Sequence, residues 1–396
     1  MILKSHLEKI LEENRSFVLE KYLLTRNLDI PDKSKSIIVI SGIRRSGKST
    51  LLKQRFATKK TSLFINFEDP RLVHFDMSDI EKLAGIMAEK GTSWLLIDEI
   101  QNLKSWEKLA RFFHDRHIKL VITGSNSSLL SKELGSKLTG RYRQFELFPF
   151  SFEEYVDYLK LEKNAENFKK YLYYGGFPEY LNEKSDDYLH TLLNNIVIRD
   201  VAVRRNIRNE DLLLRLTVFL YSNVGKIFSY NKLSTHLEIK SVRTTIDYCD
   251  YLEDSYLLEF LPQFSWSPKK QLVRPKKVYG IDTGIVRANS LSHQEDWGRY
   301  LENAVFLKLR QKQYELYYWK SATSECDFIV KNQNKIKFAI QVCWELTPDN
   351  MQRELNGIND AIKETGAETG IIITLDQEDD LNGIHVIPVW NAETLL

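Results

Sequence analysis

Residues 42–49 read Gly-Ile-Arg-Arg-Ser-Gly-Lys-Ser and match the phosphate-binding pattern G-x-x-x-x-G-K-[ST] at every position. A short apolar run at residues 36–40 precedes the motif, and a helical pattern begins at residue 50. Strand, glycine-rich turn and helix form the context that this motif requires. The alternative is a chance match in a turn rich in glycine and serine. The stretch therefore predicts an α/β fold with a phosphate-binding loop.

The chemistry of this loop follows from its backbone. Gly42 and Gly47 let the chain wrap closely around phosphate oxygens, with consecutive N–H groups pointing inward. The N-terminus of the following helix adds a partial positive charge. Lys48 can reach the β- and γ-phosphates, and Ser49 can ligate Mg²⁺. The predicted nucleotide contacts are Gly42, Ile43, Arg44, Arg45, Ser46, Gly47, Lys48, Ser49 and Thr50.

A second motif supports the first. Residues 94–99 read Trp-Leu-Leu-Ile-Asp-Glu, an apolar run that ends in two carboxylates. Such a run is typical of a strand buried on both faces of a parallel sheet. Asp98 at its carboxyl end would hold Mg²⁺, directly or through water, and Glu99 would polarise the attacking water. This is the Walker B pattern of hydrolysing ATPases. The alternative is a strand that ends in a solvated acidic turn.

Composition limits the class of protein. A chain of 396 residues predicts two to four domains, and a net charge of +2 restricts any contact with nucleic acid to local patches. Cys249, Cys326 and Cys343 are far apart and indicate neither a disulfide framework nor a zinc site. No apolar run approaches the ~20 residues of a membrane helix. The first residues lack the apolar core of a signal peptide. We therefore expect no membrane contact and a cytoplasmic location.

Apolar periodicity divides the chain into segments. Residues 1–30 have the spacing of an amphipathic helix, and from residue 36 strands alternate with helices, which favours a parallel αβα sandwich. The predicted strands are residues 37–41, 63–67, 94–98, 120–123 and 144–147, and the main helices are residues 78–90 and 106–116. After Pro149 the pattern becomes helical, which predicts a small lid.

Residues 210–288 predict a winged helix-turn-helix, with short helices followed by two β-like runs and a wing tip at residues 267–270. From about residue 297 the α/β pattern returns, with a helix at residues 299–312. The expected strands there are residues 316–319, 327–330, 338–344, 370–374 and 385–388.

Taken together, these motifs resemble AAA+-type P-loop ATPases of bacteria and archaea that carry a C-terminal domain of unknown function with a restriction-endonuclease-like, PD-(D/E)XK fold. The resemblance covers essentially the whole chain. Its marks are residues 42–50, 64–69, 96–99, 123–130, 138–141, 175–178, 279–284 and 325–328. It implies an N-terminal helical segment at 1–35, an ATPase core at 36–150, a helical lid at 151–209, a winged helix at 210–290 and a degenerate endonuclease-like domain at 291–396.

The resemblance also implies further catalytic residues. Ser125 or Asn126, after the fourth apolar strand, would hold the lytic water in the sensor role, unless this is only a polar turn. Arg141 stands where related ATPases insert an arginine finger into a neighbouring subunit, which would make the active unit a homo-oligomer. The alternative for Arg141 is a surface ion pair. Pro178 would belong to a lid element near the nucleotide base, or to a tight turn between helices.

In the C-terminal domain, the resemblance points to a metal-binding nuclease site. Glu302 fits its helix Glu and Asp327 its strand Asp, but Gln341 and Cys343 stand where Glu-x-Lys is expected. Carboxylates in such sites bind Mg²⁺, and the Lys helps to activate water. The departure predicts a degenerate site kept for packing or DNA contact.

Three functions remain open for this chain. The first is an oligomeric Mg²⁺-dependent ATPase that acts on DNA, the second is a switch ATPase that binds a protein partner, and the third is an ATP-regulated nuclease. DNA binding depends on basic residues that would hold phosphates. These are Arg199, Arg204, Arg205, Arg208, Lys240, Arg243, Lys269, Lys270, Arg274, Lys276 and Lys277. Such charges can also be a solvated face.

Overall fold

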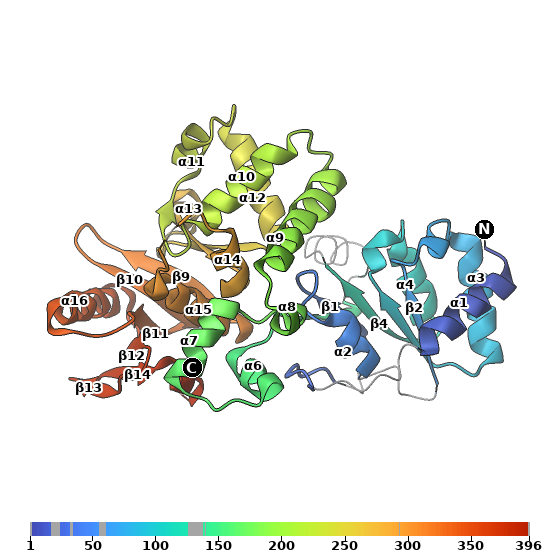
Figure 1. Cartoon of the computed structure of the whole chain (residues 1–396), viewed down its shortest axis with the longest axis horizontal. Helices are drawn as coiled ribbons and strands as arrows, with labels where there is room; N and C mark the ends of the chain where they lie inside the picture. Colours follow the sequence, from blue (N-terminus) through green and yellow to red (C-terminus); the bar gives the residue numbers. More distant parts are fainter. Residues whose placement is uncertain are drawn as a thin grey trace. The chain divides into compact units, whose positions relative to one another are not determined.

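The computed structural model describes residues 2–16, 24–31, 35–54, 61–125, 138, 140–292 and 294–394. It divides into two compact units, residues 1–149 and 150–396 (Figure 1). Among the residues described, no helix is long and apolar enough to cross a membrane.

The first unit is built on a parallel sheet of five strands in the order β2-β3-β4-β1-β5. The strands are β1 (Ile37–Ser41), β2 (Ser62–Asn66), β3 (Trp94–Asp98), β4 (Lys119–Gly124) and β5 (Tyr142–Glu146). Every residue of β1 and β3 is buried, as expected for strands covered on both faces. The predicted parallel α/β sheet is therefore confirmed; β1 and β3 have the predicted limits, and the ends of the other three strands differ by one or two residues.

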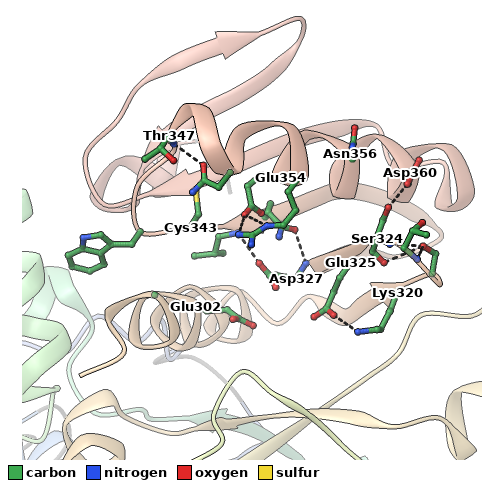
Figure 2. A pocket seen from close by; sticks show the side chains of 18 of the residues that line it. Glu302, Lys320, Ser324, Glu325, Asp327, Cys343, Thr347, Glu354, Asn356 and Asp360 are labelled. Carbon is green, nitrogen blue, oxygen red and sulfur yellow. Dashed lines mark hydrogen bonds and ion pairs between the residues drawn. The ribbon is translucent and has the colours of Figure 1, made fainter. Parts of the chain in front are cut away.

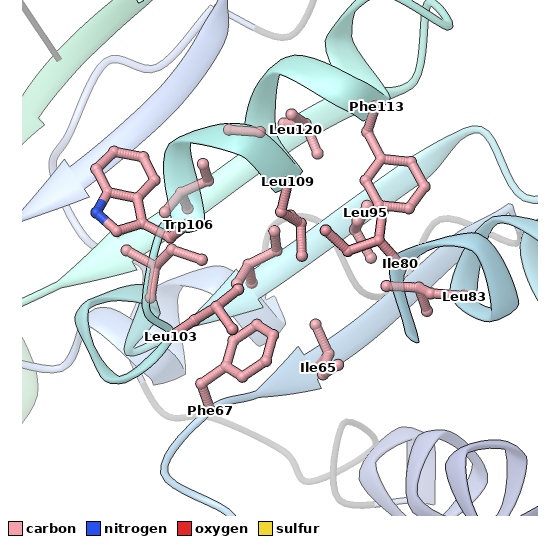
Figure 3. Close-up of a cluster of buried hydrophobic side chains, with 14 of the residues drawn as sticks. Ile65, Phe67, Ile80, Leu83, Leu95, Leu103, Trp106, Leu109, Phe113 and Leu120 are labelled. Atoms are coloured by element: carbon pink, nitrogen blue, oxygen red, sulfur yellow. The ribbon is translucent and has the colours of Figure 1, made fainter. Parts of the chain in front are cut away.

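Helices cover both faces of this sheet. On one face lie α1 (Lys4–Ser16), α3 (Met77–Glu89) and α4 (Trp106–His114), whose apolar side chains pack against alternate strand residues such as Ile65 and Leu95 (Figure 3). On the other face, α2 (Lys48–Leu52) and the segment around Ile30 pack against the intervening strand residues. Because side chains alternate between the two faces along each strand, each strand contributes to two separate cores, one on each face of the sheet.

The N-terminal helix is shorter than the sequence predicts. Helix α1 ends at Ser16, and residues 24–31 have no regular secondary structure. Ile30 lies in the range whose apolar pattern we assigned to a helix, but it is 1% exposed and packs in the core beside α2 from this irregular segment. Residues 18–23, which completed that pattern, lie outside the described part of the chain.

The second unit begins with helices. They are α6 (Phe152–Leu159), α7 (Ala165–Tyr174), α8 (Pro178–Glu183), α9 (Asp186–Asn195), a π-helix η5 (Ile196–Val203) and α10 (Glu210–Tyr221). Residues 188–203 are divided between the α-helix α9 and the π-helix η5. Ser151 begins α6 with a capping box, because its hydroxyl accepts from the Glu154 N–H and the Glu154 carboxylate accepts from the Ser151 N–H.

A three-stranded antiparallel sheet follows, in the order β6-β8-β7. Its strands are β6 (Ile227–Phe228), β7 (Leu258–Pro262) and β8 (Lys276–Gly280), with helices α11 (Tyr230–His236), α12 (Val242–Asp254) and α13 (Pro268–Val273) between them. The predicted wing tip at residues 267–270 is wrong in detail, since Pro268 starts α13, a position where proline favours a helix.

The last part of this unit is a mixed six-stranded sheet, in the order β13-β14-β12-β11-β10-β9. Helices α14 (Thr283–Asn289) and α15 (Trp297–Gln311) precede it, and α16 (Pro348–Thr365) joins β11 to β12. The strands are β9 (Glu315–Lys320), β10 (Glu325–Asn332), β11 (Lys335–Val342), β12 (Thr369–Thr374), β13 (Asp379–Leu381) and β14 (Ile384–Pro388). Sequence patterns did not predict α16 or the short, largely exposed β13.

Candidate functional site

The predicted catalytic residues of the first unit gather where three neighbouring strands end. In the parallel register Ser41 of β1 is opposite Gly124 of β4, and Ile97 of β3 is opposite Ile122. The carboxyl ends of β1, β3 and β4 therefore share one edge of the sheet. The phosphate-binding loop, the acidic pair at 98–99 and Ser125 all follow these ends.

The loop after β1 needs its glycines. Gly42 has φ +149°, and a Cβ there would lie 2.1 Å from the carbonyl oxygen of Leu147. Arg45 and Gly47 have φ angles of +68° and +94°. Such left-handed residues turn the backbone N–H groups toward a common anion-binding concavity.

Lys48 lies against this loop. Its side chain is buried, and Nζ donates to the carbonyl oxygens of Gly42 at 2.9 Å and Ile43 at 2.8 Å. Ser46 is also fully buried, and among the described residues its hydroxyl oxygen has no hydrogen-bond partner. A buried ammonium and a buried hydroxyl inside a glycine-rich turn fit a phosphate group.

Asp98 at the end of β3 meets the first turn of α2. Its carboxylate accepts a hydrogen bond from the Thr123 hydroxyl, and the Ser49 hydroxyl lies near enough to favour its charged form. Burial raises the pKa of Asp98 and the neighbouring Glu99 adds to the effect, although these donors and Lys48 act against it. A serine hydroxyl held against a carboxylate is the oxygen-donor set that Mg²⁺ prefers. The two residues predicted to hold Mg²⁺ therefore lie close together.

Glu99 is fixed by the predicted residue Ser125 and by Gln101, which the sequence analysis did not single out. Its backbone has φ +51°, and its N–H donates to the Thr123 hydroxyl at 3.2 Å. Its carboxylate accepts from Nε2 of Gln101 and from the Ser125 hydroxyl at 3.4 Å, and Gln101 also donates to Ser125 at 3.1 Å. Gln101 follows Glu99 by only two residues, yet no spacing rule assigned it a role.

Arg26 is a second residue that the sequence analysis missed. It lies in the irregular segment before β1 and is 8% exposed. Its guanidinium donates to the carbonyl oxygens of Ser46 and Phe148, each at 2.6 Å. One buried cation thus ties the phosphate-binding loop to the residues that follow β5. No motif surrounds Arg26 in the sequence, so only tertiary structure places it at the loop.

Two other predicted residues of this unit form ion pairs. Arg44 pairs with Glu68 at 3.3 Å. Arg141 pairs with Asp115 at 2.9 Å, and its side chain is 44% exposed. The structure thus contains the surface ion pair that was the alternative to an arginine finger. Thr50 lies in α2, and Asn126 lies outside the described residues.

Pro178 belongs to the second unit, where it occupies the first turn of α8. The glycines before it are explained by local packing. A Cβ at Gly175 would lie 2.2 Å from the Asp282 carboxylate, and one at Gly176 would lie 2.2 Å from the carbonyl oxygen of Phe150. The Gly176 N–H donates to Asp282 at 2.5 Å. This is the tight turn between helices that we kept as the alternative.

The predicted nuclease-type residues also come together in the second unit. Glu302 lies on α15, Asp327 on β10 and Gln341 on β11, and all three line one polar cleft of about 1320 Å³ (Figure 2). The side-chain oxygen of Gln341 accepts from the Asp327 N–H at 3.3 Å. Burial raises the pKa of Glu302 to about 7, although Lys277 acts in the opposite direction.

Family models match three consecutive parts of the chain. Residues 34–156 match an AAA domain, residues 165–296 a domain of unknown function (DUF8612), and residues 297–392 another domain of unknown function (DUF4143). The AAA match confirms the resemblance to P-loop ATPases and indicates an ATPase-like activity. The winged helix and the endonuclease-like fold stay predictions.

The chain is also similar to curated proteins along most of its length. An uncharacterized protein of Methanocaldococcus jannaschii is 32% identical, over 97% of this chain and 94% of that protein. An uncharacterized protein of Haemophilus influenzae is 30% identical, over 89% of this chain and 93% of that protein. A second uncharacterized protein of M. jannaschii is 25% identical over 79% of this chain and 76% of its own length. The chain therefore belongs to the same family as these archaeal and bacterial proteins, and its N-terminal part is an AAA domain.

Proposed function

We propose that the chain is an Mg²⁺-dependent ATPase that hydrolyses ATP to ADP and phosphate. The observation that carries this proposal is the close approach of the Ser49 hydroxyl to the buried Asp98 carboxylate, beside the ammonium of Lys48. Bound Mg²⁺ would neutralise charge on the β- and γ-phosphates. Ser49 and Asp98 would hold it, and Lys48 and the backbone N–H groups of residues 42–49 would bind the phosphates.

Glu99 is the proposed general base. It follows the proposed Mg²⁺ ligand Asp98 directly, the residue is 9% exposed, and its carboxylate is restrained by Gln101 and Ser125. A restrained carboxylate can orient a water molecule toward the γ-phosphate and accept its proton. Ser125 fits the sensor role because it contacts this carboxylate, and Asn126 is proposed as a second polar group there.

We extend the proposal to a homo-oligomer. The side chain of Arg141 is 44% exposed and its partner Asp115 is 52% exposed. Exposed ion pairs contribute only about 0–1 kcal/mol, so Arg141 can leave Asp115 at little cost and enter a neighbouring subunit's site. Pro178 is kept as a proposed contact for the nucleotide base.

The variant Glu99→Gln tests the assignment. The amide keeps the shape of the side chain but cannot accept a proton, so we expect kcat to fall by about 100-fold or more. ATP affinity should stay near that of the native protein. Glu81→Gln, an exposed glutamate on α3, is the matched control and should hydrolyse ATP normally. Unchanged turnover in Glu99→Gln would refute the role of Glu99.

We also propose that the second unit binds DNA, as a finer part of this function. Lys240, Lys269 and Lys270 are exposed, and the Arg243 side chain is 79% exposed beside Asp247. These cations lie at the start of α12 and on α13, where they could contact phosphates. Other members of the predicted basic set are engaged elsewhere: Arg205 pairs with Asp254, Arg274 donates to the Phe264 carbonyl, and Lys277 is buried.

ATP hydrolysis with and without single-stranded, duplex and branched DNA tests this part. Stimulation by one form of DNA, lost when Lys240 and Arg243 are both replaced by Ala, would support it. A rate that no DNA changes would favour the alternative, a switch ATPase with a protein partner.

A further inference from the structure

The cleft of the second unit contains an unexpected cation. Lys277 extends from β8, and its Nζ lies 2.7 Å from Asp327, 3.0 Å from Glu325 and 3.1 Å from Glu302. The side chain of Lys277 is 2% exposed. An ammonium has three N–H donors, and here three carboxylates surround it. In a nuclease-type site the carboxylates of Glu302 and Asp327 would bind a metal ion. Here they pair with the ammonium of a lysine instead.

Most of the oxygens of these three carboxylates already have a donor within the protein. Besides Lys277, Glu302 Oε1 accepts from the Tyr279 hydroxyl at 2.6 Å. Asp327 Oδ2 accepts from the Val342 N–H at 3.0 Å, and Glu325 Oε2 pairs with Lys320 at 2.8 Å. With the Lys277 contacts to Glu302 Oε1, Asp327 Oδ1 and Glu325 Oε1, five of the six oxygens of these residues have a partner.

Gln341 and Cys343, which stand where a nuclease-type site has Glu-x-Lys, supply no charged ligand for a metal ion. Gln341 is uncharged, and its oxygen already accepts from the Asp327 N–H. Burial raises the pKa of the Cys343 thiol to about 12, and the charges of Glu354 and Asp327 add to this effect, so the thiol stays neutral. The residues present therefore do not fit the metal ion that the endonuclease-like resemblance implies.

We propose that Lys277 is the resident cation of this carboxylate cluster and takes the place of a divalent metal ion. The C-terminal α/β domain then has no metal-dependent nuclease activity. If the ammonium is removed, Glu302, Glu325 and Asp327 become a latent binding site for a divalent cation such as Mn²⁺. The inference is independent of the proposed ATPase function, because it concerns only residues of the second unit.

The position of Lys277 argues against a second interpretation, in which it is a displaced catalytic lysine. A lysine that activates water must direct a donor toward the substrate. Lys277 is buried. Glu302, Glu325 and Asp327 line the cleft (Figure 2), whereas Lys277 is not among its lining residues. Its carboxylate neighbours raise the pKa of Lys277 well above its ordinary value although burial opposes this, so it remains an ammonium and not a base.

Lys277 also connects two sheets. It comes from the β6-β8-β7 sheet, whereas Asp327 and Glu325 come from β10 of the six-stranded sheet. The cluster thus acts as a structural bridge, as a bound metal ion does in other domains.

Mn²⁺ binding in the absence of nucleotide tests the proposal. The full-length native protein, Lys277→Ala and the double variant Lys277→Ala with Asp327→Asn are titrated with Mn²⁺ and followed by electron paramagnetic resonance. We expect Lys277→Ala to bind one more Mn²⁺ per chain than the native protein and the double variant to lose it. Any weak Mn²⁺ binding at Ser49 and Asp98 is the same in all three proteins, so it does not affect the difference in bound Mn²⁺ between them.

Two outcomes would overturn the proposal. One is a folded Lys277→Ala protein that binds no additional Mn²⁺. The other is a native protein that loses an Mn²⁺ ion, or an Mn²⁺-dependent cleavage of DNA, when Asp327→Asn is introduced alone. This second comparison does not need Lys277→Ala to fold, so it decides the question on its own if that variant is insoluble.

Discussion

Replacing Arg26 by Met should weaken ATP binding, although Arg26 belongs to no nucleotide-binding motif. Its guanidinium makes two short hydrogen bonds of 2.6 Å, one to the Ser46 carbonyl inside the phosphate-binding loop and one to the Phe148 carbonyl. Methionine fills similar space but donates to neither carbonyl. The loop would then lose its connection to the residues after β5.

The magnitude follows from these two contacts. A hydrogen bond from a charged donor contributes about 1.5–3 kcal/mol, and Arg26 is 8% exposed, so screening by water is small. Two such bonds give a loss of about 3 kcal/mol at the lower limit. If the loop must be reordered when nucleotide binds, this loss becomes an approximately 100-fold weaker affinity. Arg26→Lys should lose a large part as well, because an ammonium cannot reproduce the planar fork that reaches both carbonyls.

Isothermal titration calorimetry with ATP and Mg²⁺ measures the effect. Arg116→Met is the matched control, because Arg116 also donates to a backbone carbonyl, that of Phe112 at 3.1 Å, but is exposed. The control should bind ATP within about twofold of the native protein, as expected for a surface substitution. An Arg26→Met protein that is folded and binds ATP equally tightly would refute the reasoning, since the loop would then hold its shape without the guanidinium.

Two further predictions concern Gln101 and Glu253. Gln101→Ala should lower kcat about tenfold with unchanged ATP affinity, because Gln101 restrains the Glu99 carboxylate but touches no loop residue; a changed affinity with normal kcat would contradict this. Burial, aided by Glu259, raises the pKa of Glu253 from 4.5 to about 7, so its stabilising contribution is full below pH 4.5 and lost as pH rises through 7. Glu253→Gln should therefore lose less thermal stability than the native protein between pH 5 and pH 8, and equal losses in the two proteins would contradict this.

The sequence predicted those parts of the first unit that depend on local pattern. The buried run at residues 94–98 is β3 with the same limits, and the loop at residues 42–49 lies between β1 and α2. We could also expect the loop and the carboxyl end of β3 to lie close together, because the carboxyl ends of parallel strands lie on one edge of a sheet. The predicted helix was wrong at residues 24–31, which form an irregular segment whose apolar residues Leu28 and Ile30 pack in the core beside α2.

Lys277 shows why a cluster of charges in a sequence can mislead. Residues 269–277 contain five basic side chains, which we predicted to hold DNA phosphates or else to form a solvated face. Successive residues of a strand point to opposite faces, so Lys276 and Lys277 on β8 cannot share a surface. Lys276 lies over the Tyr230 ring, whereas Lys277 shares its face with Tyr279 and reaches Glu302 and Asp327. The alternation was present in the sequence, but the acidic partners lie 25 and 50 residues away along the chain, and only the fold brings them to the ammonium. A basic run should therefore be divided by strand alternation before its charge is assigned to a nucleic-acid surface.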